Sequence, residues 1–299
     1  APRRLGPGPM GESSIYRSPE GEAGLAALYE EALARLGPGC ETRRVGTSLG
    51  ETHVILAGPE DAPPLIVLPG GNFLNPLCLS WFLPLAGAFR IYAPDIIGQP
   101  GRSAQTRPSA KGDGHARWLV DVLDGLGLGR VPFVGISYGA GIILRLAGLA
   151  PERVAGSVLV SPAGIATGPI WPMIRETALP MLVYRAFPNR ERLLRAARPI
   201  LTDLEEPYVR QLGLVYRHVK LDRELPRAAT REELAGYEAP TLLFSAENDL
   251  FFPAEKVIPR AGEIIPNLET EMLPGDRHVP SRQTFARIND RIAAFLNPA

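Results

Sequence analysis

The 299-residue chain carries short apolar runs at regular intervals, separated by segments whose apolar residues lie three and four positions apart. Continuous apolar runs of this length are typical of parallel strands that are covered on both faces. The strand candidates are 64–68 (PLIVL), 89–93 (FRIYA), 131–136 (VPFVGI), 154–160 (VAGSVLV), 240–244 (PTLLF) and 268–273 (LETEML). The helix candidates between them are 75–85, 113–126, 137–150, 253–265 and 281–296. This alternation predicts a doubly wound, mostly parallel α/β sheet.

Two parts of the chain depart from the alternation. Residues 42–57 predict two short antiparallel strands around a glycine turn, and a helix precedes them that begins at Ser18-Pro19-Glu20. Residues 166–238 contain no good strand and predict three helices, at 172–187, 190–200 and 205–219. We therefore expect an N-terminal tail and helix (1–41), a first part of the α/β core (42–165), a helical lid inserted between two core strands (166–238) and a second part of the core (239–299).

Composition narrows the classes of partner. Lys+Arg and Asp+Glu number 32 each, so no global field favours nucleic acid or an anionic membrane. No apolar run approaches membrane-spanning length, and the N-terminus lacks the apolar region of a signal peptide. Cys40 and Cys78 show neither C-x-x-C nor metal-ligand spacing, which favours a reducing, cytoplasmic location. With no cluster of metal ligands, we expect no metal and no cofactor, and a small molecule as partner; the oligomeric state stays open.

Residues 135–139 read Gly-Ile-Ser-Tyr-Gly, where the strand candidate 131–136 meets the next helix. In a doubly wound sheet, functional groups gather at the carboxyl ends of strands. The two glycines permit a sharp turn that exposes Ser137 at a helix N-terminus, the G-x-S-x-G nucleophile elbow. By spacing alone, a glycine-rich turn with a serine N-cap explains the motif equally well. The nucleophile interpretation therefore requires a base and an acid, without which a serine hydroxyl is not nucleophilic.

The base is sought among four histidines. His53 lies in an early strand, His115 begins a surface helix and His218 lies on the lid, and each is interpreted as an exposed or satisfied side chain. His278 differs because it follows the last strand candidate, again at a carboxyl end. We predict His278 as the base.

The acid is expected after an intervening strand, in the order Ser–Asp–His. After strand candidate 240–244 comes Ser-Ala-Glu-Asn-Asp, in which Asp249 is the first choice and Glu247 the alternative. Asp95, at the end of another strand candidate, is interpreted as a residue that caps a turn.

An oxyanion site is expected where the first core strand ends in Leu-Pro-Gly-Gly-Asn, residues 68–72. Small residues there leave backbone N–H groups free to face the nucleophile. We predict the N–H groups of Gly71 and Tyr138 as the donor pair. The Asn72 side chain is a further candidate for substrate contact, and turn capping explains it equally well.

Together, these motifs resemble the α/β-hydrolase superfamily, in its Ser-His-Asp carboxylesterase-like branch. The resemblance runs from about residue 42 to the C-terminus, and includes residues 95–103 (DIIGQPGRS), which are similar to the family's D-x-x-G-x-G-x-S turn with one extra residue. It implies a serine hydrolase that cleaves a carboxylic ester or related acyl substrate through an acyl-enzyme, with Ser137, His278 and Asp249 as the triad. A serine argues against the haloalkane dehalogenase and epoxide hydrolase branches, which attack with aspartate.

Two positions depart from the family pattern. Pro69 stands where the family usually has the histidine of a His-Gly oxyanion loop, so a side chain that can brace the loop is missing. Arg277 stands where a glycine often precedes the catalytic histidine, which predicts a bulky cation near the entrance to the site.

The motifs are compatible with several substrate classes. Thioesterases, lactonases and C–C bond hydrolases use the same triad, and a ligand-binding signalling homologue keeps the same fold without turnover. Many lid residues, including Trp171, are apolar, as are Phe251 and Phe252 beside the acid. These residues predict contacts with an apolar or aromatic acyl or alcohol group. Packing of the lid on the core explains them equally well.

Overall fold

The computed structural model describes residues 14–222 and 224–296, so most of the predicted N-terminal tail lies outside the described residues. An eight-stranded sheet forms the centre, in the order β1-β2-β4-β3-β5-β6-β7-β8. The first two strands run antiparallel to their neighbours, and all pairs from β4 to β8 are parallel. The bounds are β1 Cys40–Thr47, β2 Gly50–Ala57, β3 Pro64–Leu68, β4 Arg90–Pro94, β5 Val131–Ile136, β6 Val154–Val160, β7 Thr241–Ala246 and β8 Leu268–Leu273. The predicted doubly wound, mostly parallel sheet is confirmed.

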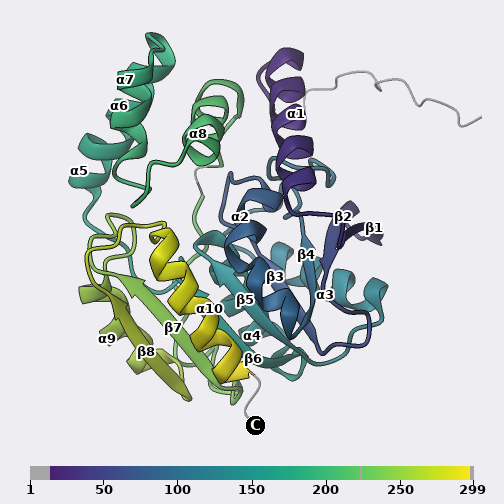
Figure 1. Cartoon of the computed structure of the whole chain (residues 1–299). Coiled ribbons are helices and arrows are strands. Elements are labelled where there is room, and N and C mark those ends of the chain that lie inside the picture. The colour runs from purple at the N-terminus through teal and green to yellow at the C-terminus, as the bar shows by residue number, and fades with distance from the viewer. Residues whose placement is uncertain (1–13, 223, 297–299) are drawn as a thin grey trace, which may run out of the picture.

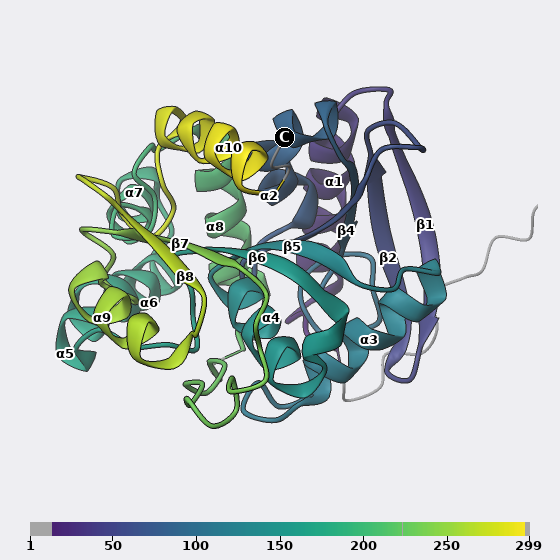
Figure 2. The same ribbon diagram turned by 90° about the horizontal axis from the view of Figure 1, so that it is seen from below.

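Helices cover both faces of the sheet (Figure 2). One face packs against α2 (Asn75–Phe82) and α10 (Arg282–Leu296). The other packs against α3 (Gly114–Leu126), α4 (Tyr138–Leu149) and α9 (Ala254–Ile264). Two short 3-10 turns, Leu83–Gly87 and Pro151–Arg153, follow α2 and α4. Because the central strands are covered twice, β3, β5 and β6 are buried almost throughout, which explains their unbroken apolar sequences.

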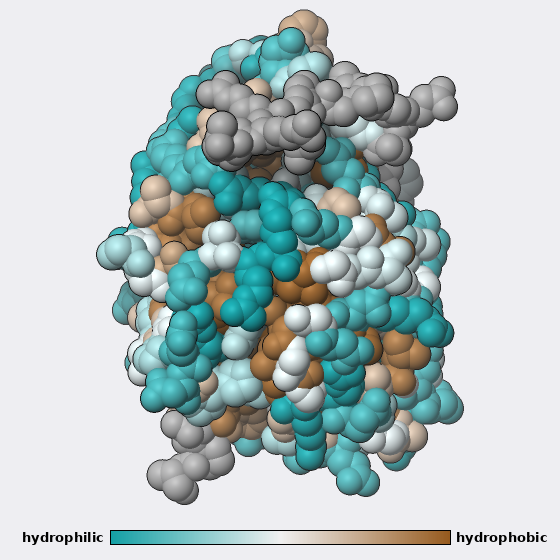
Figure 3. Space-filling view, turned by 90° about the vertical axis from the view of Figure 1, so that its right-hand side faces the viewer, coloured by the Kyte–Doolittle hydropathy of each residue, from teal (hydrophilic) through white to brown (hydrophobic). Residues whose placement is uncertain are grey.

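The outer strand β1 has a different pattern, with most of its side chains exposed. It carries Glu41, Arg43 and Arg44, and polar side chains cover much of this side of the molecule, with apolar patches between them (Figure 3). Charged residues along an edge strand disfavour pairing with the edge of another molecule.

The N-terminal helix α1 (Pro19–Arg35) begins as predicted, with Ser18 as N-cap and Pro19 in the first turn. Its apolar stripe is buried through Leu25, Leu28, Tyr29 and Ala32. The helix lies against α2 and α8, next to the helices inserted between β6 and β7 (Figure 1).

Residues 166–238, which we call the inserted segment, connect β6 to β7. Its helices are α5 (Ile170–Met173), α6 (Leu179–Ala186), α7 (Arg190–Ala197) and α8 (Glu206–His218). A π-helical turn, Ile174–Ala178, joins α5 to α6, so the predicted helix 172–187 is one run with a local irregularity. Pro180 follows this turn and lacks the N–H that regular helical bonding requires. The inserted helices stand together beyond one end of the sheet, next to α1 (Figure 1). No described helix is both long and apolar enough to cross a membrane.

Candidate active site

Ser137 lies at the junction of β5 and α4, in a backbone conformation that residues other than glycine rarely adopt. Its φ is 54° and its ψ is −114°, outside both helical and extended regions. The turn is held by hydrogen bonds in which the N–H of Ser137 donates to Val160 and those of Gly141 and Ala163 donate to the Ser137 carbonyl. Strain of this kind persists only where the surroundings enforce it, and it is frequent at functional sites. The side chain of Ser137 remains half-buried, not sealed in the core.

The two glycines of the motif are required by close approach of backbone. A Cβ at Gly135 would lie 2.8 Å from the Ala140 nitrogen, and one at Gly139 would lie 2.5 Å from the Pro69 carbonyl oxygen. Both distances are shorter than carbon atoms tolerate, so β5, α4 and the loop after β3 meet at Ser137 only because both positions lack side chains. These contacts favour the elbow interpretation over a simple capped turn, and Ser137 makes no side-chain cap bond to α4.

His278 lies in the loop between β8 and α10 and reaches both predicted partners. Its Nε2 is 2.9 Å from Ser137 Oγ, and its Nδ1 is 2.8 Å from Asp249 Oδ2. The ring is buried, with 9% of the residue exposed, and the rings of Phe251 and Phe252 lie at 5.0 and 5.5 Å from it. Three residues that lie far apart in the sequence thus form one chain of hydrogen bonds at the carboxyl ends of β5, β7 and β8.

Asp249, and not Glu247, faces the histidine. The second oxygen of Asp249, Oδ1, accepts the N–H groups of Phe251 and Phe252 at 2.8 and 3.1 Å, which fixes the carboxylate in its turn. Asp249 is 3% exposed. Glu247 Oε2 instead accepts the N–H of Gly275 at 2.8 Å and holds the neighbouring loop. Of the two acids that the sequence left open, the structure brings only Asp249 to His278.

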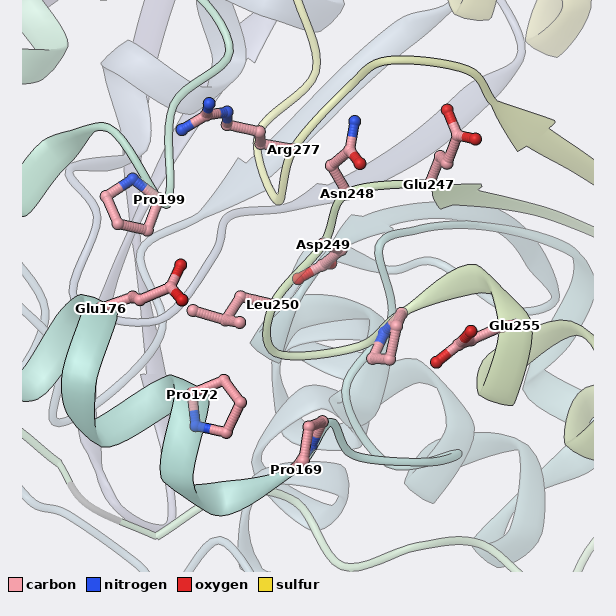
Figure 4. Close-up of a pocket in the computed structure, with 11 residues that line it drawn as sticks. Pro169, Pro172, Glu176, Pro199, Glu247, Asn248, Asp249, Leu250, Glu255 and Arg277 are labelled. Atoms are coloured by element: carbon pink, nitrogen blue, oxygen red, sulfur yellow. The ribbon is translucent and has the colours of Figure 1, made fainter.

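A cavity of about 420 Å³ lies at the Asp249 turn, next to α5 (Figure 4). Its lining includes Glu176, Glu247, Asp249 and Arg277, and does not include Ser137. Arg277 does not point toward the serine. Its guanidinium donates to the carbonyl of Arg198, at the end of α7, and its N–H donates to Thr202 Oγ1 at 2.8 Å. The cation predicted near the entrance thus joins the histidine loop to the inserted segment.

The two residues predicted to supply the oxyanion donors, Gly71 and Tyr138, lie in segments that pack closely together. The oxyanion loop, residues 70–74 after β3, packs on the elbow so closely that a Cβ at Gly71 would lie 3.1 Å from Tyr138 Cβ. Within the described part of the chain, neither the N–H of Gly71 nor that of Tyr138 donates to a protein acceptor. The N–H of Tyr138 belongs to the first turn of α4, where helical N–H groups lack internal partners. N–H groups without a protein acceptor at this elbow are of the kind that can stabilise a developing oxyanion.

The other predicted contacts differ in burial. Phe251 is half-buried beside the His278 ring, whereas Phe252 is 2% exposed and packs in the core. Trp171, on α5, leaves 76% of its surface exposed. Asn72 has a φ of 56° in the oxyanion loop, and its Oδ1 is buried without a partner among the described residues.

The remaining histidines contribute elsewhere. His53 is buried against Tyr29 and Arg102, and His218 packs at the end of α8 against α1. His115 is a correction: it begins α3 as predicted, but it is buried, with its ring edge-to-face against Tyr138 at 5.5 Å. Burial, helped by the charge of Arg107 and opposed by a hydrogen bond with the Ile97 backbone, lowers the pKa of His115 from 6.5 to about 4.

Asp95 is confirmed as a turn-capping residue, because its Oδ2 accepts the N–H of Arg102 at 2.7 Å. It also accepts the Tyr29 hydroxyl and the Asn75 amide, both at 2.9 Å, and so links α1 and α2 to the turn after β4. Among the described residues, no group of three or more His, Cys, Asp or Glu side chains is placed to hold a metal ion.

Known proteins share both the sequence and the fold. The carboxylesterase YbfK of Bacillus subtilis (strain 168) is 29% identical over 284 residues, covering 92% of this chain and 95% of YbfK. The uncharacterized carboxylesterase nap of the same organism is 29% identical over 288 residues, covering 90% and 91%. The crystal structure of naproxen esterase from Bacillus subtilis is similar with a TM-score of 0.80 at 26% identity, covering 94% of this chain and 100% of that one. A family model described as "alpha/beta hydrolase fold" matches residues 63–281. The chain therefore belongs to the α/β-hydrolase fold family.

Proposed function

We propose that this chain is a serine carboxylesterase that works through an acyl-enzyme. The observation that carries the proposal is the hydrogen-bonded arrangement of three residues: a strained serine, a histidine at 2.9 Å from it, and an aspartate at 2.8 Å from that histidine. It is supported by the N–H groups of Gly71 and Tyr138, which have no protein acceptor among the described residues. Two similar chains are named carboxylesterases, which favours esters over the thioesters, lactones and C–C bonds that the same groups attack elsewhere.

In the proposed reaction, each proton has a defined path. Ser137 Oγ attacks the ester carbonyl carbon while His278 Nε2 takes the hydroxyl proton, and Asp249 stabilises the imidazolium through Nδ1–H. The carbonyl oxygen becomes an oxyanion and is held by the N–H groups of Gly71 and Tyr138. His278 then returns the proton to the alkoxide, which leaves as the alcohol. Water repeats the sequence on the acyl-enzyme and releases the acid.

The fixed carboxylate of Asp249 determines which nitrogen of His278 can take the serine proton. Its Oδ1 is committed to two backbone N–H groups, so Oδ2 is left to accept Nδ1–H and holds the imidazole in the tautomer whose Nε2 is free to take a proton. A carboxylate that accepts three hydrogen bonds in a buried turn does not need to reorient during the reaction.

The substrate group next to the triad is proposed to be apolar or aromatic, because the half-buried ring of Phe251 lies beside His278. We further propose that the inserted segment acts as a lid over the site. Between residues 170 and 187 of this segment, seven large apolar side chains are exposed, so they neither pack in the core nor enclose a ligand. They are Ile170, Trp171, Ile174, Leu179, Leu182, Val183 and Phe187.

The test is release of p-nitrophenol from a series of p-nitrophenyl esters by the whole chain, with a matched thioester and a lactone. We expect a burst close to one equivalent of enzyme followed by steady turnover, with esters preferred. Binding of the esters without any release of p-nitrophenol would contradict the proposal and favour a ligand-binding homologue.

A further inference from the structure

Two backbone N–H groups of the oxyanion loop donate to the side chains of glutamines from distant segments. The N–H of Asn72 donates to Gln99 Oε1 at 2.8 Å, and the N–H of Leu74 donates to Gln211 Oε1 at 2.9 Å. Gln99 lies in the turn after β4, and Gln211 lies on α8 of the inserted segment. Because a backbone N–H only donates, both amide groups must present their oxygen to the loop.

The bond from Leu74 to Gln211 is buried at both ends, and the bond from the half-buried Asn72 ends on a buried glutamine. Gln99 is 3% exposed, and Gln211 and Leu74 are 0% and 1% exposed. A buried N–H that loses its acceptor has little access to water as a replacement, so the loop must shift to find another partner.

The loop does little to hold itself. Its internal backbone hydrogen bond is long: the N–H of Phe73 donates to the carbonyl of Gly70 at 3.3 Å. Asn72 has a φ of 56°, an unfavourable conformation for a residue with a side chain. The position of Gly71, between these residues, therefore depends on partners outside the loop.

The sequence departures explain why outside partners are needed. Pro69 supplies neither an N–H nor a polar side chain where the family pattern has a histidine. The turn at residues 95–103 carries one residue more than the family pattern, and Gln99 lies in this longer stretch, between Gly98 and Gly101. The longer turn thus delivers an acceptor to the loop that lacks its usual brace.

We infer that Gln99 and Gln211 are positioning residues of the oxyanion hole: they fix the N–H groups of Asn72 and Leu74 and so hold the Gly71 N–H beside that of Tyr138. This inference rests on the proposed function. Neither glutamine touches the reacting atoms. Through Gln211, the inserted segment contributes to turnover of every ester, whatever its size.

The test compares Gln99→Met and Gln211→Met, which remove the acceptor, with Gln99→Glu and Gln211→Glu, which keep an oxygen at the same place. For p-nitrophenyl acetate, we expect the Met variants to lose about tenfold or more in kcat, with KM close to wild type, because the oxyanion exists only in the transition state. Affinity for a trifluoromethyl ketone, whose serine adduct carries an oxyanion, falls by the same factor. The Glu variants recover most of the loss, because burial keeps the carboxyl groups protonated and neutral, with an oxygen that accepts the loop N–H.

Val215→Ala is the matched control, because Val215 is buried one turn further along α8 and makes no hydrogen bond with the loop. We expect Val215→Ala to have a lower melting temperature than wild type, and a kcat equal to that of wild type at temperatures where the variant is folded. The inference is overturned if the Met variants keep wild-type kcat, if Val215→Ala loses as much, or if the Glu variants recover nothing.

Should Gln211→Met fail to fold, Gln211→Asn replaces it. Asparagine is one methylene shorter and withdraws the oxygen from Leu74, so its kcat must fall below that of Gln211→Glu; equal values overturn the inference. Ester turnover by the wild-type chain is measured in the same series. Its absence would refute the proposed function, separately from the role of the glutamines.

Discussion

Replacing Asp249 by asparagine separates charge from shape at the triad acid. Oδ1 of Asp249 accepts two backbone N–H groups, at 2.8 and 3.1 Å, and Oδ2 faces His278 Nδ1 at 2.8 Å. In the variant, the amide oxygen keeps the backbone N–H groups, because these only donate, and the amide NH₂ turns to His278. Nδ1 must then accept, so the ring proton moves to Nε2 and points at Ser137 Oγ. In this tautomer His278 cannot take the serine proton.

We expect kcat for p-nitrophenyl acetate to fall by about 10⁴, as loss of the correct tautomer costs in other serine triads. That factor corresponds to about 5.5 kcal/mol of transition-state stabilisation. The melting temperature should change little, since shape and the two backbone hydrogen bonds are preserved.

Glu247→Gln is the matched control. Glu247 accepts the N–H of Gly275, which an amide oxygen also accepts, so its turnover should stay close to that of wild type. A larger loss for Glu247→Gln than for Asp249→Asn, or wild-type turnover in Asp249→Asn, would refute this assignment of the acid.

Three further predictions concern the surroundings of the triad. Gly71→Ala places a Cβ 3.1 Å from Tyr138 Cβ and should lower kcat about tenfold or more by displacing an oxyanion donor. Gly70→Ala, whose added Cβ would lie 3.8 Å from its nearest neighbour, should keep the wild-type kcat. Equal kcat values for the two variants would contradict the placement of the donor. His115 has a pKa of about 4 in the folded chain and 6.5 in the unfolded chain, so the unfolded chain takes up the proton first as the pH falls. The free energy of unfolding is therefore unaffected by His115 above pH 6.5 and decreases by about 3 kcal/mol between pH 6.5 and pH 4. Urea unfolding at pH 7 and pH 4 should show this extra loss in wild type and not in His115→Phe; parallel losses would count against it. Phe251→Ala should lower kcat/KM for aryl esters about tenfold more than for acetate esters, and an equal loss would mean that Phe251 only packs against His278.

Much of the fold was predictable because burial on two faces leaves a simple trace in the sequence. β3, β5 and β6 are continuous apolar runs, and their predicted bounds agree with the structure. The elbow was predictable because Gly135 and Gly139 are required by contacts within one strand–turn–helix unit. Asp249 was the first choice for the acid, but the sequence kept Glu247 as an alternative, because the decision depends on which side chain the turn after β7 directs to His278.

The sequence did not predict where single polar side chains lie between neighbouring helices and strands. His115 was expected at the surface, yet it is buried because α3 packs on α4 at Tyr138, which is a tertiary contact without a local signal. Gln99 and Gln211 were not identified as partners of the oxyanion loop. Gln211 had left a trace: it shares the buried face of α8 with Leu212 and Val215, where an apolar residue is expected. The predicted triad and oxyanion donors all lie outside the inserted segment, and through Gln211 this segment also contacts the oxyanion loop.

The central claim is that Ser137 is the nucleophile, and covalent labelling tests it most directly. The whole chain is incubated with a p-nitrophenyl phosphonate, and the modified residue is located by peptide mass spectrometry. The account predicts one equivalent of phosphonate on Ser137, loss of ester turnover in proportion to labelling, and no labelling of Ser137→Ala, whose fold and melting temperature stay close to wild type. Phosphonate on another residue, or ester turnover that survives in Ser137→Ala, would contradict it.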